Sequence, residues 1–523
     1  MFDKNKYYHI HTNTIVFWLI LFISCFIRLF ALGDIPAGIH QDEALIGYNA
    51  FTLLMTGADS WGIHAPVYLM GWGSGTSILY VLLTKLCFYL YGVNVWALRL
   101  IQAVMGCVSC YVFYKLLRLF YSQQIALLGF FLISVMPWSI MNSRWALDSN
   151  IEPVFWLLAF YFYCCADKHK SWLLLSSVFY ALTMYAYAGY WLFILLTLPV
   201  QYLYLLWLKK DRETFKTILF SGLLFAFLIL PLGWLISVNG GWLDEYKSAW
   251  LSVPKLLAWR SHEIGTENLL FKLTMLYKVF ILQNDGWLSN VIPAYGLFYL
   301  FTPLFMLIGI WMLGKGAQAD FKAGCFSLNF CILLQIIVGF IYAGLIYAFS
   351  NRVNFLFIPL LVATTLGIWT LKNKRYLFYV VIIAYVGSFA CFMHTYFVKY
   401  NQMLSQQAPF SFSYGLKDAL AEAEKLHQIR HGDIYILEHP YVYSKVLFYN
   451  NINPQGYLNT VQWHKYPDPF IQARRFLYYR FVQYLDFDNL AKEHIYIIHK
   501  DNLPYVQNMV VEIYGNYLVA YQK

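Results

Sequence analysis

Long apolar runs separated by short polar stretches dominate the first 400 residues of the chain. A helix needs about 20 mostly apolar residues to cross a bilayer. The run over 171–208 is too long for one crossing, and Ala188 and Gly189 near its middle predict a turn between two helices. The pattern predicts eleven transmembrane helices, near 11–32, 97–117, 124–142, 151–166, 171–187, 190–208, 217–237, 291–313, 325–346, 352–371 and 376–398.

The segment 76–92 is ambiguous, because it is apolar but short and carries Lys85. If it crossed the membrane, most clusters of Lys and Arg would lie outside, against the positive-inside rule. If it lies at the outer interface as a helix, the same clusters lie inside together with the N-terminus. We therefore predict an interfacial helix, an N-terminus inside and a C-terminus outside. The clusters in question are at 115–118, 168–170, 209–212 and 372–375.

This topology predicts two domains. Residues 1–399 form an all-α polytopic membrane domain, with a first outer loop over 33–96 and a large outer loop over 238–290. Residues 400–523 form a small α/β domain outside the membrane. Within this tail the periodicity predicts a helix at 414–426 and strands at 433–438 and 495–499.

The composition supports a multi-pass membrane protein. Hydrophobic residues make up 60% of the chain and charged residues 12%, about half the charged share of soluble domains. The net charge of +10 does not indicate nucleic-acid binding, because Lys and Arg fall in short clusters between apolar runs. All nine cysteines lie in apolar segments and none follows residue 399, so no disulfide framework is expected in residues 400–523.

Charged residues at the predicted outer face break the apolar pattern. Ionisable groups at membrane depth are costly and usually pair or serve function. Arginine suits phosphate, because its planar guanidinium binds two oxygens at once. Arginines around acids therefore suit an anionic lipid headgroup and acid–base chemistry, and salt bridges between loops are the alternative. The residues concerned are Arg28, Arg99, Arg144, Arg352, Asp42, Glu43, Asp148 and Glu152.

The acidic pair Asp42 and Glu43 is the strongest candidate among them. Neighbours on a helix point about 100° apart, so one acid can face a substrate while the other pairs with an arginine or caps the helix. His40 could be a metal ligand beside them, but one histidine with two acids is a poor metal signature. Asp59 is predicted to be a turn residue first and a substrate contact second.

The stretch LGDIPAGIHQDEALIGYNAFTLLMTGADSWGIHAPVY, residues 32–68, resembles the first outer loop of the family 39 glycosyltransferases. This family has the GT-C fold and includes protein O-mannosyltransferases and lipid A aminoarabinose transferases. Residues 92–106, 137–163 and 350–369 are similar to the bacterial members in the same order. Residues 70–80 depart from the family, because they lack its Lys-Pro or Pro-Pro element. What that element contributes to lipid-phosphate or acceptor binding is therefore open.

The resemblance implies an inverting glycosyltransferase that moves a sugar from a polyprenyl-phosphate donor to a glycan, lipid or protein of the cell envelope. It implies Asp42 as the catalytic base and Glu43 as a catalytic or acceptor-side partner. Four arginines would bind the donor phosphate, and four further residues would support the site. These are Arg144, Arg352, Arg99 and Arg28 for the phosphate, and His40, Asp148, Glu152 and Asp59 in support.

The chemistry fits these residue types. A lipid phosphate is a good leaving group, so the reaction needs positive charge to receive it and a base on the opposite face of the sugar. Single displacement then inverts the anomeric centre, and a divalent metal ion is an optional aid. The chain has no Walker loop or dinucleotide-binding glycine pattern, so a nucleotide donor is not expected.

Two other classes remain open. A transporter or lipid flippase would place polar residues at mid-membrane and show repeated halves. A non-catalytic envelope protein could retain a GT-C-like fold without activity. The expected location is the cytoplasmic membrane with the site on its outer face, and no nucleic-acid partner is expected.

Overall fold

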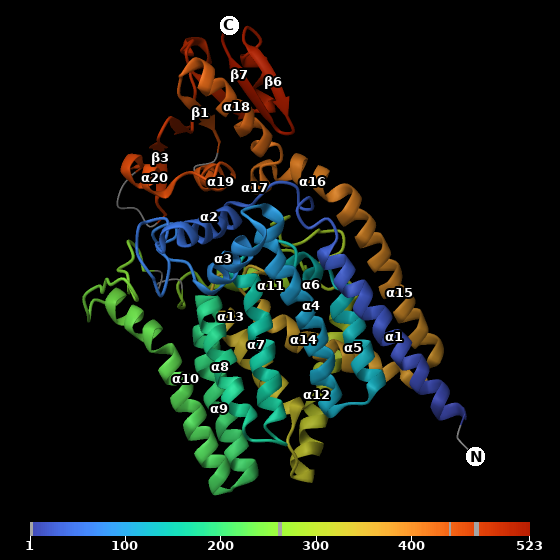
Figure 1. The fold of residues 1–523 in the computed structure, drawn as a ribbon. Coiled ribbons are helices and arrows are strands. Elements are labelled where there is room, and N and C mark those ends of the chain that lie inside the picture. The colour runs from blue at the N-terminus through green and yellow to red at the C-terminus, as the bar shows by residue number, and fades with distance from the viewer. Residues whose placement is uncertain (1–3, 260–263, 439–440, 465–469) are drawn as a thin grey trace. The chain divides into compact units, whose positions relative to one another are not determined.

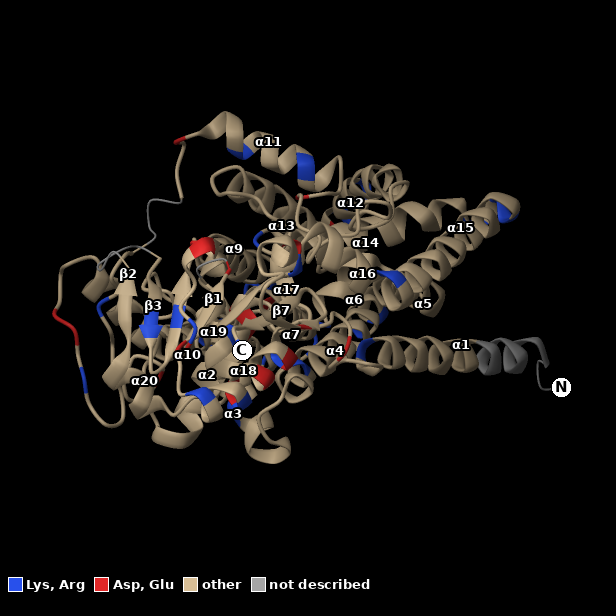
Figure 2. Cartoon of the chain, turned by 90° about the horizontal axis from the view of Figure 1, so that it is seen from above, with Lys and Arg blue, Asp and Glu red and all other residues tan. Residues whose placement is uncertain are grey.

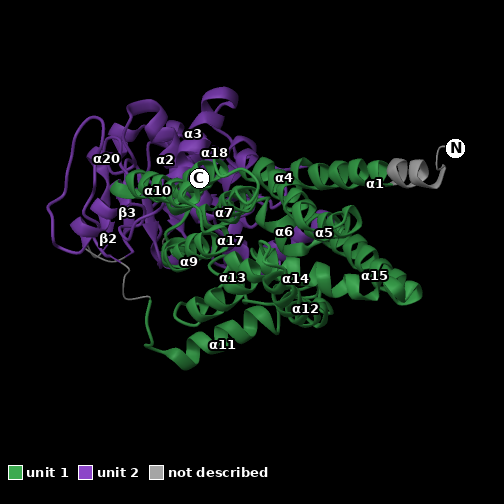
Figure 3. Cartoon of the chain, turned by 90° about the horizontal axis from the view of Figure 1, so that it is seen from below, with its two compact units in different colours: residues 1–30, 102–230, 261–395 green, residues 31–101, 231–260, 396–523 purple. Residues whose placement is uncertain are grey.

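The computed structural model describes residues 4–259, 264–438, 441–464 and 470–523 (Figure 1). The chain forms two compact units, coloured separately in Figure 3. Unit 1 comprises residues 1–30, 102–230 and 261–395, and unit 2 comprises residues 31–101, 231–260 and 396–523. Each unit is therefore assembled from three separate segments of the chain.

Unit 1 is built of helices. The longest contain apolar residues on most faces, as expected for helices that contact lipid or one another. Their bounds are α1 Lys4–Leu29, α4 Val95–Phe120, α5 Gln123–Val135, α6 Pro137–Asn142, α7 Asp148–Cys165, α8 Trp172–Ala186, α9 Trp191–Lys209, α10 Arg212–Asn239, α11 Leu269–Phe280, α12 Thr302–Ala323, α13 Leu328–Ala343, α14 Phe357–Trp369 and α15 Arg375–His394. The first turns of α4 and the last turns of α10 belong to unit 2.

Each of the eleven predicted spans contains a helix, but several bounds differ from the prediction. The helix predicted over 124–142 ends at Val135 and a short helix begins at Pro137, because a residue before proline avoids the helical conformation. The helix predicted over 291–313 begins only at Thr302. The turn predicted near residue 188 is present as a short 3₁₀ helix over Ala188–Tyr190 between α8 and α9.

The protein is a multi-pass membrane protein. Within the described residues, five helices are by themselves long and apolar enough to cross a bilayer, and five shorter apolar helices accompany them. Figure 2 shows that charged residues are absent from the middle of α15, whose one Lys or Arg is Arg375 at its start. The number of transmembrane spans and the orientation of the chain, with its N-terminus inside, stay predictions.

Two glycines set the closest helix packing in unit 1. Gly309 on α12 and Gly367 on α14 lie where these helices cross, and a Cβ atom on Gly367 would lie 2.0 Å from the Phe305 carbonyl oxygen. A Cβ atom on Gly309 would lie 1.7 Å from the Ala363 carbonyl oxygen. Small residues at such crossings let helix backbones approach closely, so these two positions fix the distance between α12 and α14.

Unit 2 contains the segment predicted as the first outer loop, the end of α10 with the residues that follow it to 260, and the tail of the chain. The predicted interfacial helix is present as α3 Leu79–Tyr91, packed beside α2 Gln41–Thr56. One face of α3 is buried, and its other face exposes Leu82, Leu86 and Tyr89. An exposed apolar face of this kind is typical of a helix that lies against lipid, although its place in the membrane stays a prediction.

The tail of unit 2 forms an α/β fold, as predicted. It holds a seven-stranded sheet in the order β2-β3-β4-β1-β5-β7-β6. Strand β1 is parallel to β4 and β5, and the other neighbours are antiparallel. The elements are α16 Tyr400–Gln407, α17 Pro409–Phe412, α18 Leu416–Arg430, β1 Ile434–Leu437, α19 Val442–Tyr449, α20 Pro454–Thr460, β2 Gln462–His464, β3 Gln472–Phe476, β4 Tyr479–Val482, β5 Ile495–His499, β6 Val510–Tyr514 and β7 Tyr517–Tyr521.

The sequence predicted α18, β1 and β5, and the structure confirms all three. Strand β5 is buried at all five positions, which agrees with the apolar run that identified it. Five further strands were not predicted. Strands such as β3, with two exposed arginines in QARRF, lack the apolar run or clean alternation that marks a strand.

The packing of α12 on α14 predicts that Gly367→Ala destabilises unit 1. The added methyl group would meet backbone, so about 1–3 kcal/mol of stability should be lost, seen as a lower Tm of the detergent-purified protein. Gly387→Ala on α15 is the matched control, because no heavy atom lies within 4 Å of its Cβ position and alanine is the better helix former. Equal Tm values for the two variants would contradict this packing.

Candidate active site

The acidic pair lies in the first turn of α2, where the helix is capped by its own side chains. His40 is the N-cap residue, and its Nδ1 accepts a hydrogen bond from the Asp42 backbone N–H (3.3 Å). The His40 backbone N–H donates to Glu43 Oε2 (3.0 Å). Reciprocal capping of this kind satisfies the free N–H groups of a first turn. The cap therefore fixes how residues 40–43 enter the helix.

Glu43 is fully buried and forms a two-pronged ion pair with Arg99 of α4. Arg99 Nε donates to Glu43 Oε1 (2.8 Å) and Nη2 donates to Oε2 (2.9 Å). The remaining N–H groups of Arg99 donate to the carbonyl oxygens of Leu32 (3.3 Å), Pro36 (2.8 Å) and Gly38 (2.9 Å). All five donors of the guanidinium are thus used within unit 2. Glu43 and Arg99 hold the loop 32–38 against the start of α2.

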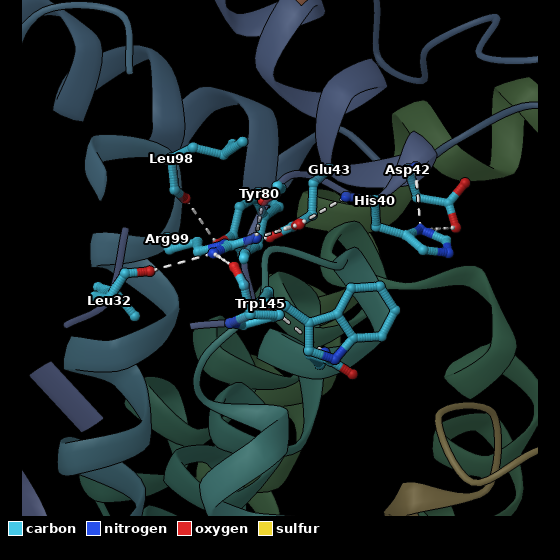
Figure 4. A network of polar contacts seen from close by, with 12 residues as sticks. Leu32, His40, Asp42, Glu43, Tyr80, Leu98, Arg99 and Trp145 are labelled. Carbon is cyan, nitrogen blue, oxygen red and sulfur yellow. Dashed lines mark hydrogen bonds and ion pairs between the residues drawn. The ribbon is translucent and has the colours of Figure 1, made fainter. Parts of the chain in front are cut away.

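Asp42 points away from this pair (Figure 4). Its side chain is 35% exposed, whereas that of Glu43 is 0% exposed. Asp42 Oδ1 accepts a hydrogen bond from the Trp72 indole N–H (3.3 Å), and Oδ2 lies 3.4 Å from His40 Nδ1. Burial lowers the pKa of His40, so the imidazole is neutral at pH 7 and the contact is no ion pair. Asp42 is therefore the acid of the pair that is accessible to solvent.

Residues of the tail cover the start of α2. The Ile39 backbone N–H donates to the Phe412 carbonyl (2.8 Å), and Ser444 Oγ donates to the Gln41 carbonyl (3.1 Å). The Phe412 ring packs edge-on against His40 at 5.7 Å between ring centres. The tail therefore forms part of the surroundings of Asp42.

A buried ion pair in the tail stabilises this covering segment. Lys445 Nζ donates to the Phe410 carbonyl (2.9 Å) and Ser413 Oγ (2.5 Å), and lies 3.8 Å from Glu438 Oε1. Glu438 accepts hydrogen bonds from Ser413 Oγ (2.9 Å) and the Tyr517 hydroxyl (2.7 Å). Burial lowers the pKa of Lys445, while the charges of Glu438 and Asp42 oppose that shift. Lys445 thus places a buried cation near the acidic pair.

Asp59 is buried in the loop that follows α2. Its Oδ1 accepts hydrogen bonds from the backbone N–H groups of Trp61 and Ile63, both at 2.9 Å. These contacts are those of the turn residue expected from the sequence. Burial raises the pKa of Asp59 to about 6, so the carboxyl is partly protonated near neutral pH.

In unit 1, Arg28 and Arg144 are fully buried. Arg28 donates to Ser24, Ser139 and the carbonyls at the end of α5. Arg144 Nη1 donates to the carbonyls of Ile27 (2.6 Å) and Arg28 (3.2 Å) at the end of α1. These contacts satisfy carbonyls that a helix end leaves without partners. The phosphate-binding role of both arginines stays a prediction, and their geometry favours a structural one.

The other unit 1 candidates have different surroundings. Arg352 is only partly buried, and its guanidinium lies 5.7 Å from the Phe349 ring centre. Asp148 begins α7 and its Oδ1 accepts from the Ser149 backbone N–H (2.8 Å). Glu152, one turn further, is fully buried. A phosphate-binding role for Arg352 and supporting roles for the two acids stay predictions.

Sequence reasoning missed Trp72, Tyr441 and Lys445 as neighbours of the site. Trp72 lies in the glycine-rich stretch 70–75 where the Lys-Pro element is missing, and its ring packs edge-on against Tyr441 at 4.8 Å. Trp72 reaches Asp42 from the loop that follows α2, whereas Tyr441 belongs to the tail and reaches the Trp72 ring. A metal ion at Asp42 would have His40 as its neighbouring ligand. Within the described residues, no three His, Cys, Asp or Glu side chains are grouped to hold a metal ion.

Two comparisons connect this geometry to known proteins. Residues 76–236, less than a third of the chain, match the family model described as dolichyl-phosphate-mannose-protein mannosyltransferase. The match includes Arg99 and Arg144 but begins after Asp42, so it gives the acidic pair no support. No curated protein sequence matches the chain.

The fold is shared with ArnT from Cupriavidus metallidurans. The structure of ArnT bound to undecaprenyl phosphate is 10% identical, with a TM-score of 0.56 over 96% of this chain and 97% of that one. The apo structure of ArnT is 11% identical, with a TM-score of 0.53 over 97% of this chain and 98% of that one. The chain therefore has the GT-C fold of membrane glycosyltransferases, and the resemblance predicted from its sequence is confirmed.

The buried pair predicts a specific pattern of stability. Arg99→Met leaves the Glu43 carboxylate buried without its partner, which costs about 3–5 kcal/mol. Adding Glu43→Gln removes that charge, so the double variant should have a higher Tm than Arg99→Met alone. Arg118→Met on the exposed face of the same helix is the control. If the second substitution restored no stability, the structural role of the pair would be refuted.

The raised pKa of Asp59 predicts a pH-dependent stability. The folded-state pKa of Asp59 is about 6, above the ordinary 3.8. Its contribution to the free energy of unfolding is therefore fully present below about pH 4, and about 3 kcal/mol of that free energy is lost as the pH rises through 6. Asp59→Asn keeps the acceptor for Trp61 and Ile63 and removes the titration. Its Tm should exceed that of the wild type above pH 7 but not at about pH 4. The control Asp244→Asn, in an exposed loop, should have the Tm of the wild type at both pH values. A Tm of Asp59→Asn that changes with pH in parallel with the wild type would contradict the raised pKa of Asp59.

Proposed function

We propose that the protein is an inverting glycosyltransferase that moves a sugar from a polyprenyl-phosphate donor to a cell-envelope acceptor, with Asp42 as the catalytic base. The GT-C fold supports the reaction class. The family model at residues 76–236 is named for a dolichyl-phosphate sugar enzyme, and one ArnT structure is bound to undecaprenyl phosphate. Both names point to lipid-phosphate donors.

The observation that supports the role of Asp42 is the difference in environment between the two acids, because Glu43 is buried and paired and Asp42 is partly exposed. Glu43 is enclosed, capped and paired, so it cannot reach a substrate without leaving a buried guanidinium unpaired. Asp42 has one oxygen held by Trp72 and a side chain that is one-third exposed. An oriented carboxylate with an accessible oxygen is what a general base requires.

The proposed step is a single displacement. The oxygen or nitrogen of the acceptor hydroxyl or amine attacks the anomeric carbon of the donor sugar. Asp42 takes the proton that this acceptor group loses. The bond between that carbon and the lipid-phosphate oxygen breaks, and the phosphate departs with the electron pair. The Trp72 indole N–H fixes the orientation of the carboxylate, so the accessible oxygen faces the acceptor. Attack opposite the leaving group inverts the anomeric centre.

The orientation predicted from the Lys and Arg clusters places this chemistry at the outer face of the cytoplasmic membrane. Acceptors available there are envelope glycans, lipids and proteins. Arg352 is the proposed phosphate ligand among the four arginines, because the guanidinium groups of Arg28, Arg99 and Arg144 are buried against protein acceptors. Lys445 adds positive potential near the base without contacting a substrate.

The test is transfer in purified membranes, supplied with a panel of undecaprenyl-phosphate-linked radiolabelled sugars. Asp42→Asn should lower the initial rate by about 10²–10⁴-fold, while the folded fraction and Tm stay unchanged. Asp244→Asn, an exposed acid of the same unit, is the matched control and should retain the wild-type rate. Wild-type turnover in folded Asp42→Asn would remove Asp42 from the mechanism, and no transfer by the wild type with any donor would refute the function.

A further inference from the structure

A cavity of about 590 Å³ lies in unit 2 beside the loop that Arg99 holds. Its walls come from four places: the loop 33–38, the start of α4, the start of α18 and the end of α19. Asn401 of α16 completes it. A volume of this size fits a ligand of two or three sugar rings, within the usual range for small-molecule sites. None of the residues assigned above as base, cap or ion pair lines it.

The walls of the cavity are fixed by contacts that leave its interior open. Asn401 Oδ1 accepts from the Ala37 backbone N–H (2.8 Å) and its Nδ2 donates to the Asp34 carbonyl (3.0 Å). Gly38 and Gly415 both have positive φ, and a Cβ atom on either would lie 2.0 Å from a backbone oxygen of the tail. The loop 33–38 and the start of α18 are thus held by backbone packing. Such a pre-formed wall lowers the entropy cost of binding.

The side chains that line the cavity combine exposed rings with unpaired charges. Trp96 is 40% exposed and Tyr414 is 46% exposed. Asp34, Lys417 and Asp418 are also exposed, and none of the three forms an ion pair with another described residue. Opposite charges that share a cavity without pairing remain available to a ligand. The cavity therefore offers two aromatic faces, two acceptor carboxylates and one donor ammonium.

This set of groups selects a class of ligand. Two carboxylates against one ammonium repel an anion, and a lipid chain would bury charges without partners. A sugar ring has an apolar C–H face for the aromatic rings, and neighbouring hydroxyls that donate to carboxylates and accept from ammonium. We propose that this cavity binds an uncharged or amine-bearing oligosaccharide.

The position of the cavity gives that ligand a role, which rests on the proposed function. Gly38 lines the cavity, and its carbonyl oxygen accepts from Arg99, whose partner Glu43 adjoins Asp42. The loop 33–40 therefore forms one wall of the cavity and also leads into the helix that bears Asp42. In this role the bound oligosaccharide is the part of a glycan acceptor that lies next to the acceptor sugar receiving the transferred sugar.

The test measures binding rather than transfer. Full-length protein in nanodiscs is titrated with three probes, namely mannotriose, chitotriose and glucosamine trimer, followed by saturation-transfer NMR and calorimetry. At least one trisaccharide should bind, and Trp96→Ala and Tyr414→Ala should each weaken it about tenfold. Asp418→Asn should weaken it by a smaller factor. Tyr484→Ala and Asp488→Asn, an exposed ring and an exposed acid outside the cavity, should bind as the wild type does.

The outcomes separate this proposal from the proposed function. Asp42→Asn should bind the trisaccharide normally while losing transfer. No binding of any trisaccharide by a wild type that transfers sugar would overturn the cavity assignment and leave the function standing. Binding that survives Trp96→Ala and Tyr414→Ala would also overturn it. Glycerophosphoethanolamine is a fourth probe, and its binding in place of the sugars would assign the cavity to a lipid headgroup instead.

Discussion

The buried contact between Glu43 and Arg99 is the constraint on which the candidate site depends. A carboxylate and a guanidinium without solvent exposure are tolerable only if each finds a full set of partners. Here every N–H group of Arg99 and both oxygens of Glu43 have one. This requirement fixes the start of α2, the loop before it and the first turn of α4 as one body. Arg99 holds Glu43 in one orientation, and this fixes the first turn of α2. The direction of the neighbouring Asp42 side chain follows from that turn.

The sequence predicted the helices well because lipid imposes a simple rule on them. A spanning segment must satisfy its backbone internally and present apolar side chains, so its position is visible in the hydropathy of the chain. Ends were less predictable, since the ends of α5 and α12 depend on proline and on local turns. The sheet was only partly visible. Strand β5 is apolar from residue 495 to residue 498, whereas β3 carries the polar residues Gln472, Arg474 and Arg475.

The same contrast holds for the candidate site. Helical geometry alone predicted that one acid of the pair would face a substrate while the other paired or capped. The structure shows that Glu43 is the acid that pairs and caps and that Asp42 is partly exposed, and contact of Asp42 with a substrate stays a prediction. The partners were not accessible from sequence. Lys445 lies about 400 residues from Asp42 along the chain, and no periodicity joins them. Arg144 had the chemistry of a phosphate ligand, but only the fold shows its guanidinium against the carbonyls that end α1.

The covering of α2 by the tail has a consequence for biosynthesis. Ser444 and Gln41, which are hydrogen-bonded, are 403 positions apart. At about 5–20 residues per second of synthesis, the ribosome adds the later residue about 20–80 seconds after the earlier one. During that interval the helix bearing Asp42 is exposed on the face that Phe412 and α19 later bury. A chain released before residue 412 lacks these contacts, so the apolar side chains of α2 stay uncovered and are open to quality-control proteases.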